Sequence, residues 1–152
     1  MNELQAALKV LLANAYVMYF RAHSYHWNVE GMIFSQFHNF FGGIYEDVYD
    51  SIDDIAEHIR SIQGYAPFSL ADVLSAKTEQ EDTERVVMLA DMLRNLQRAN
   101  DEMISSLNHV SLLAQLHDKQ GLLNYVADRL DKHAKHGWMI RASAKSFGGT
   151  ND

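Results

Sequence analysis

The sequence of 152 residues contains no cysteine, which excludes disulfides and metal sites built from thiolates. This absence fits a reducing cytoplasm without requiring one, and the cytoplasm is the location that we expect. A single proline and eight glycines leave little room for the many turns of an all-β fold. No apolar run approaches the roughly 20 residues that cross a bilayer, and the N-terminus lacks the pattern of a secretory signal, so no membrane contact is expected.

Positive charge is also scarce. Thirteen lysines and arginines stand against 20 acidic residues, which gives a net charge of −7. Such a chain is not expected to bind nucleic acid in general, because phosphates need basic partners. Hydrophobic residues make up 47% of the chain, enough for a core, and the length suits one domain over residues 1–152.

Apolar residues recur at helical spacing along most of the chain, which predicts four long helices. We expect them at about residues 3–29, 35–64, 84–108 and 119–145. Asn2 and Ser35 are predicted to cap the first two helices, and Ser69 is predicted to cap a short helix in the long middle connection. This pattern is typical of an all-α, ferritin-like four-helix bundle with a short extra helix in that connection.

Imidazole and carboxylate side chains concentrate between residues 23 and 57. His26 and His38 lie on the first two expected helices, and Asp53 and Glu57 lie four positions apart on one face of the second. Taken alone, such acids are more often a solvated helix face, and such histidines are more often hydrogen-bonded interior groups. Together, without a thiol, they suit iron, manganese or zinc, and we expect them to hold iron.

The bundle interior is not expected to hold this metal. Di-iron bundles commonly use Glu-x-x-His motifs, and this sequence contains none. The candidate ligands belong to only two helices, which cannot easily surround an ion, so an interface between two copies is favoured. One chain would supply histidines and its twofold mate would supply acids, and a twofold contact would create two identical sites.

The same stretch resembles a known family. From His23 it reads HSYHWNVEG, followed by Phe34 and His38 at F-x-x-x-H spacing, and then DDIAE from Asp53 with Arg60 shortly after. This signature is similar to that of the Dps mini-ferritins, named after a DNA-binding protein of starved cells. The similarity is close over residues 22–67, and KHGWMIRA near the C-terminus also resembles the last helix of that family.

The resemblance implies a homododecameric cage that oxidises ferrous iron at sites between subunits and stores ferric mineral, which protects against oxidative damage. Hydrogen peroxide, or dioxygen, would be the oxidant. The resemblance also implies that His26 and His38 bind iron from one subunit, and that Asp53 and Glu57 bind it from the twofold mate. Two irons can share such a site. Trp27 would be the site-adjacent tryptophan that supplies an electron or quenches a radical.

One position departs from the family pattern. Family members often carry an aspartate one helical turn after the second histidine, where this chain has Gly42. The second iron position is therefore weaker, filled by water, or completed by Asp50, Asp54 or His23. The pair Gly42-Gly43 costs about 1 kcal/mol per glycine inside a helix, and we expect it to allow close approach of another backbone.

The remaining titratable residues receive simpler interpretations. His133 and His136 are expected at solvated positions or in a helix-end charge role. Asp118 and Asp128 are candidates for the pore through which iron would enter a cage.

Two alternative functions stay open. The first is a DNA-compacting or structural shell with weak or no ferroxidase activity, which the departure at Gly42 favours. Direct DNA binding is nevertheless not expected, because the first helix begins at about Glu3 and the terminal GGTND carries no basic residue. The second alternative is a zinc- or manganese-binding relative, because the ligand set accepts those metals.

Overall fold

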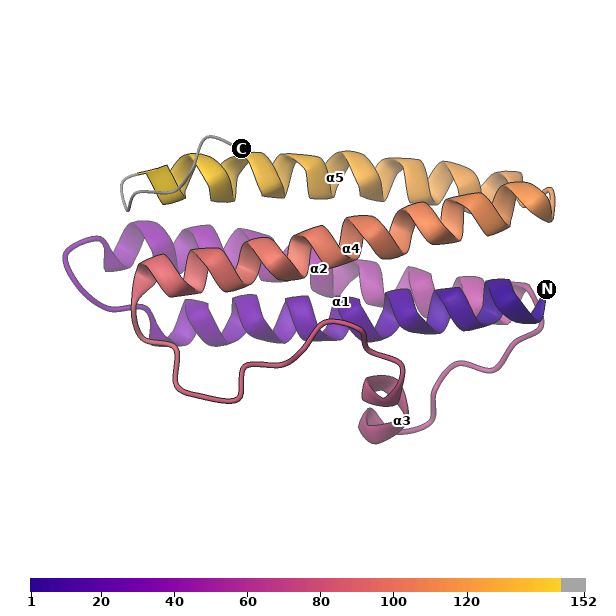
Figure 1. Ribbon diagram of the computed structural model, residues 1–152, viewed down its shortest axis with the longest axis horizontal. Helices are drawn as coiled ribbons and strands as arrows, with labels where there is room; N and C mark the ends of the chain where they lie inside the picture. The colour runs from indigo at the N-terminus through magenta and orange to yellow at the C-terminus, as the bar shows by residue number, and fades with distance from the viewer. Residues whose placement is uncertain (146–152) are drawn as a thin grey trace.

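A computed structural model describes residues 1–145, and every regular element within them is a helix. The helices are α1 (Asn2–Asn28), α2 (Phe34–Ser61), α3 (Leu70–Ser75), α4 (Leu89–Leu116) and α5 (Gln120–Ala144). The four long helices lie side by side as a bundle, and α3 interrupts the connection from α2 to α4 and contacts α1 (Figure 1). The predicted all-α four-helix bundle with a short extra helix is confirmed.

The long connection determines the direction of the second pair of helices. Residues 62–88 travel the length of the bundle, so α2 and α4 run in the same direction, and α1 and α5 run in the opposite one (Figure 1). No helix within residues 1–145 combines the length and the apolar character needed to span a membrane.

The apolar stripes of the long helices meet in one core. Its completely buried large side chains include Leu8 and Met18 of α1, Phe41 and Ile59 of α2, and Leu93 and Leu96 of α4. Each such side chain contributes about 1.5–3 kcal/mol when it leaves water. This packing brings the end of α1 against the beginning of α2.

Both predicted ends of the third long helix are wrong. The helix α4 begins at Leu89, five residues later than expected. The segment before it is not helical because its side chains are bonded to residues of α1. The Arg21 guanidinium holds Glu79 at 3.1 Å, and the Tyr25 hydroxyl donates to Asp82 at 2.6 Å. The helix continues to Leu116 because further buried apolar residues extend its stripe past residue 108.

Only one of the three predicted caps forms. Ser69 accepts a hydrogen bond from the Asp72 amide at 3.0 Å and so caps α3 as expected. Asn2 and Ser35 instead lie inside α1 and α2, and the residues before these helices make no side-chain cap bond. The capping predictions for Asn2 and Ser35 are therefore wrong.

Two helices end through a residue in the left-handed region. Gln63 has a φ of 64° after α2, and Asp118 has a φ of 54° after α4. The following amides return to carbonyls five residues earlier, with Gly64 bound to Ile59 and Lys119 bound to Ala114, both at 2.9 Å. These bonds satisfy carbonyls that the helices leave free.

Candidate metal centre

The two histidines predicted as metal ligands meet where the end of α1 faces the beginning of α2. His26 Nδ1 lies 2.6 Å from the backbone oxygen of His38, and His38 Nδ1 lies 2.7 Å from the backbone oxygen of His26. The two rings stack with centroids 3.7 Å apart and planes 19° from parallel. Gly31, with a φ of +109° that favours glycine, turns the chain between them.

The bonds between these histidines determine which nitrogen can bind a metal. A carbonyl oxygen only accepts hydrogen bonds, so each Nδ1 carries the hydrogen of its ring and donates it. The lone pair of each neutral ring therefore lies on Nε2. The carbonyl groups in the last turn of a helix have no amide donors within that helix, and the His26 carbonyl is one of them in α1. The hydrogen bond from His38 Nδ1 therefore also satisfies this carbonyl.

Gly42 leaves room for the His26 ring. A Cβ built at Gly42 would lie 3.2 Å from His26 Nδ1 and 3.3 Å from His26 Cε1, whereas a Cβ at Gly43 would meet nothing within 4 Å. The expected close approach of another backbone is therefore wrong, because the neighbour of Gly42 is an imidazole. A side chain at position 42 would force that ring to move.

The two predicted acidic ligands lie elsewhere on α2. Asp53 and Glu57 are exposed and one turn apart. Asp53 follows His38 by 15 positions, which is about 22 Å along the helix at about 1.5 Å per residue. Within residues 1–145 of one chain, no cluster of three or more histidine, aspartate or glutamate side chains could hold a metal ion. One chain does not bring the four predicted ligands together.

The other acidic candidates are also exposed. Asp50 and Asp54 lie on α2 beside Asp53, far from the histidine pair along the helix. Asp118 lies in the turn between α4 and α5, and Asp128 lies on α5. Their roles at a second iron position and in an entry pore stay predictions.

Several aromatic residues lie close to the histidine pair. Trp27 is 54% exposed, and its ring lies 4.0 Å from the His23 ring, which also stacks on Tyr45 of α2 at 4.0 Å. Burial, followed by the charge of His26, lowers the pKa of His23. His23 Nδ1 lies 3.0 Å from the Tyr19 hydroxyl, so this side chain is already engaged within the aromatic cluster.

A second polar cluster, which the sequence reasoning missed, lies inside the bundle. His133 is completely buried and His136 is 7% exposed, so the expected solvated or helix-end positions are wrong. Arg129 donates twice to Asp47 at 2.9 Å, and His136 Nε2 donates to the same carboxylate at 2.6 Å. His133 Nδ1 donates to Asn100 Oδ1 at 2.9 Å, and its Nε2 accepts from Arg129 at 3.1 Å.

The charges in this cluster follow from its partners. Burial and the charge of Arg129 lower the pKa of His133 to about 3, so this ring is neutral. Burial alone would raise the pKa of Asp47, but the bonds from His136 and Arg129 hold it well below its usual range. The guanidinium already supplies the cation that the partly buried carboxylate needs, so the cluster is structural.

Helical spacing was the available signal for these buried residues. Arg129, His133 and His136 lie three or four positions apart, in step with the buried Val126 and Ile140 on the same helix. The neighbouring Lys132 and Lys135 are typical of a solvent-facing helix surface, which favoured the wrong environment for His133 and His136.

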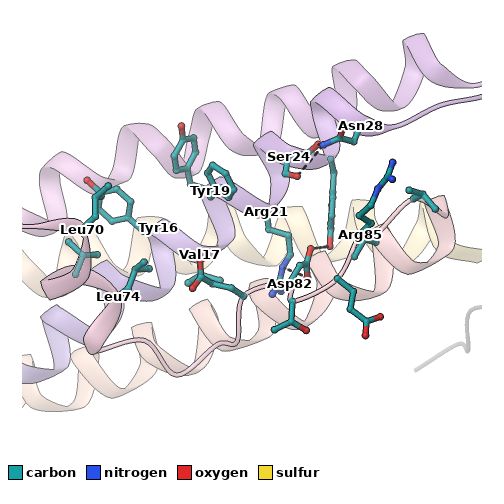
Figure 2. A pocket seen from close by; sticks show the side chains of 18 of the residues that line it. Tyr16, Val17, Tyr19, Arg21, Ser24, Asn28, Leu70, Leu74, Asp82 and Arg85 are labelled. Atoms are coloured by element: carbon teal, nitrogen blue, oxygen red, sulfur yellow. Dashed lines mark hydrogen bonds and ion pairs between the residues drawn. The ribbon is translucent and has the colours of Figure 1, made fainter.

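A cavity of about 760 Å³ lies between α1 and the chain at residues 81–87. Figure 2 shows Leu70 of α3 and Asp82 of the connection facing α1 across it. Arg21 reaches from α1 to this connection and donates to Glu79 and to the backbone oxygen of Asn95, at 3.1 and 2.8 Å. The four predicted metal ligands are absent from its lining, so the cavity and the histidine pair are separate features.

Known proteins share both the sequence pattern and the fold. The family model for the ferritin-like domain matches residues 5–147. A DNA protection during starvation protein of Helicobacter pylori is 27% identical over 135 residues, covering 89% of this chain and 94% of that protein.

Two solved structures agree closely with this chain. The Dps protein of Vibrio cholerae, described as a member of a broad superfamily of ferritin-like diiron-carboxylate proteins, is 28% identical with a TM-score of 0.86. The match covers 93% of this chain and 88% of that one. Antigen TpF1 of Treponema pallidum is 26% identical with a TM-score of 0.89, and the match covers 95% and 92%. The chain therefore belongs to the ferritin-like family, as a Dps mini-ferritin.

Proposed function

We propose that this protein stores and detoxifies iron by oxidising ferrous ions at sites shared between two copies of the chain. Membership of the family supports iron storage and protection as the general role. Hydrogen peroxide or dioxygen would take the electrons, and ferric mineral would collect inside a homododecameric cage of single-domain chains. The observation that carries the proposal is the His26–His38 pair, whose Nδ1 atoms are bound to carbonyls and whose Nε2 atoms are left for a metal.

The chemistry of the ligands supports a shared site. Neutral imidazole and carboxylate suit ferrous iron, although zinc or manganese can substitute. His26 and His38 lie near one end of α2, and Asp53 and Glu57 lie about 22 Å or more further along it. A twofold contact with the two α2 helices antiparallel would bring the histidines of each chain opposite the acids of the other.

The proposed reaction balances without a free radical. Two ferrous ions give one electron each to one hydrogen peroxide, which takes two protons and becomes two water molecules. Asp53 and Glu57 would offset the added positive charge of the ferric products. Trp27, half exposed beside His23, would quench a radical that escapes this two-electron reaction.

The experiment is oxidation of ferrous iron by hydrogen peroxide in the assembled protein, followed by ferric absorbance. Wild type should react at least about tenfold faster than the His26→Ala/Asp53→Ala double variant, which lacks one ligand from each side. The control variant His109→Ala/Asp131→Ala removes one exposed histidine and one exposed aspartate outside α2, and it should match wild type. Equal rates in wild type and the ligand variant would refute the proposal.

A DNA-compacting or structural shell with weak ferroxidase activity is the second candidate, and Gly42 favours it. The position one turn after His38 offers no carboxylate, so a second iron would have one ligand fewer. The net charge of −7 opposes DNA binding, and the terminal GGTND lies outside the described residues. A clear shift of plasmid DNA at low salt, together with slow iron oxidation, would select this alternative.

A further inference from the structure

The aromatic cluster beside the histidine pair contains a hydrogen-bonded tyrosine–histidine couple. Tyr19 and His23 lie four positions apart on α1, with the Tyr19 hydroxyl 3.0 Å from His23 Nδ1 and the ring centroids 5.5 Å apart. In the tautomer with its hydrogen on Nε2, the imidazole accepts the phenolic hydrogen at Nδ1. A tyrosine held in this way can lose an electron while its proton moves to the histidine.

Other aromatic rings connect this couple to the candidate ligand His26. Tyr45 stacks on His23 at 4.0 Å and 17°, and its centroid lies 5.1 Å from that of His26. Tyr19 lies 6.3 Å from Tyr45 and 5.1 Å from Tyr49, which is 55% exposed. A row of rings therefore leads from the histidine pair to the protein surface.

We propose that Tyr19 is a redox-active tyrosine that supplies an electron to peroxide reduction at the iron site, with His23 as its proton acceptor. This inference rests on the proposed iron oxidation, with His23 bonded to Tyr19 rather than completing the second iron position. When a single ferrous ion is bound, that ion gives one electron to hydrogen peroxide and Tyr19 gives the other. The O–O bond breaks, and the peroxide takes two protons from solvent to form two waters. The phenolic O–H bond also breaks, which leaves a neutral phenoxyl radical and an imidazolium at His23.

The glycine at position 42 makes an electron donor such as Tyr19 useful in this chain. Without a carboxylate at position 42, the second iron position would have fewer ligands, and turnover with one iron bound would become frequent. Peroxide that receives only one electron releases a hydroxyl radical. An electron from Tyr19 completes the two-electron reduction before that radical forms.

The test uses the assembled full chain with less than one ferrous ion per histidine pair and an excess of hydrogen peroxide. Samples are frozen within milliseconds for electron paramagnetic resonance, and ring-deuterated tyrosine identifies tyrosyl radicals. Wild type should give a tyrosyl signal that is mostly lost in Tyr19→Phe, which removes only the hydroxyl. The control Tyr65→Phe removes an exposed hydroxyl beyond the end of α2 and should keep the signal.

His23→Gln tests the proton acceptor separately, because glutamine can accept a hydrogen bond but cannot take up the proton. The tyrosyl signal should form more slowly in this variant. In wild type, its formation should slow in deuterated water, because the proton moves together with the electron. The same comparisons apply to metal-free protein oxidised by a photogenerated ruthenium(III) complex.

The outcomes separate this inference from the proposed function. Ferric absorbance with a tyrosyl signal unchanged in Tyr19→Phe, or with only a tryptophanyl signal, overturns the inference and leaves iron oxidation standing. If wild type develops no ferric absorbance, the proposed iron oxidation fails. The metal-free measurement then decides whether Tyr19 and His23 form a redox couple.

Discussion

The histidine side chains of this protein differ in the atom that meets Nδ1. For His26 and His38 that atom is a backbone oxygen, which leaves Nε2 for a metal. For His23 it is a tyrosine hydroxyl, and for His133 it is the amide oxygen of Asn100. One type of side chain therefore serves the proposed metal binding, the proposed proton transfer or a neutral interior role, according to its partner.

The buried His133 makes stability depend on pH. Its pKa is about 3 in the folded chain, against an ordinary value of 6.5, so the unfolded chain binds the proton more readily. The stabilisation from the neutral ring is fully present above pH 6.5 and declines as the pH falls toward 3, by on the order of 4 kcal/mol. Denaturant titrations across this range should show the decline.

The matched variants for this prediction are two glutamine substitutions. His133→Gln cannot be protonated, so the decline between pH 6.5 and about 4, above most carboxylate titration, should flatten. His109→Gln removes an exposed histidine of α4 and should keep the wild-type slope. A wild-type slope in His133→Gln would contradict the assignment.

Gly42 and Gly43 provide a second prediction from neighbouring residues. Gly43→Ala places a methyl group in open space and should stabilise α2 by about 0.5–1 kcal/mol, because alanine favours the helix. Gly42→Ala presses on the His26 ring, so this gain should shrink or vanish, and ferrous iron should bind more weakly. Thermal unfolding and iron titration of both variants measure these effects. Equal behaviour of the two variants would show that the ring moves freely.

Among the helices and connections, the contact between α1 and the connection from α2 to α4 depends on Arg21. Its guanidinium is nearly inaccessible and pairs with Glu79 and Asp82. Arg21→Met would leave these carboxylates without a cation, at a cost of about 3–5 kcal/mol. Limited proteolysis should then cut the chain near residues 79–88, and the denaturation midpoint should fall.

Arg94→Met is the control for this prediction, because Arg94 pairs with Asp91 across an exposed turn of α4. Its effect should stay within about 1 kcal/mol, as for other surface ion pairs. Comparable losses in both variants would mean that Arg21 contributes nothing beyond a surface contact.

The helices themselves could be predicted from spacing, and their ends could not. The stripe from Leu4 onward is long and regular, so the existence of α1 followed directly from the sequence. The start of α4 depends on bonds from Arg21 and Tyr25, which lie more than 50 residues earlier in the chain. Spacing places His133 on the buried side of α5 with Val126 and Ile140, but an apolar pattern does not record its polar partners Arg129 and Asn100.

In the whole molecule, the structure brings together His26 and His38 of the predicted set, and the roles of Asp53 and Glu57 in a second copy stay predictions. The spacing of His26, His38, Asp53 and Glu57 indicated the set, and the use of only two helices indicated a second copy. The carbonyl bonds that orient the two rings depend on the turn at Gly31 and on the approach of α1 to α2, which no local pattern records.

Mixing inactive variants tests whether two chains share a site. A His26→Ala/His38→Ala chain and an Asp53→Ala/Glu57→Ala chain should each be inactive alone. Co-assembled in equal amounts, half of the twofold pairs would be mixed, and one of two sites in each would be intact. Iron oxidation should therefore return to about a quarter of the wild-type rate. No recovery in verified mixed assemblies would argue against a shared site.

The bonds exchanged by His26 and His38 would couple the contact between α1 and α2 to the proposed metal binding. Each imidazole is bonded through Nδ1 to the backbone of the neighbouring helix, so neither ring can rotate without breaking that bond. The orientation of both rings toward a bound ion would therefore depend on how α1 packs against α2. Insertions or substitutions in residues 29–33, which connect α1 and α2, would therefore change the orientation of both rings without changing any proposed ligand.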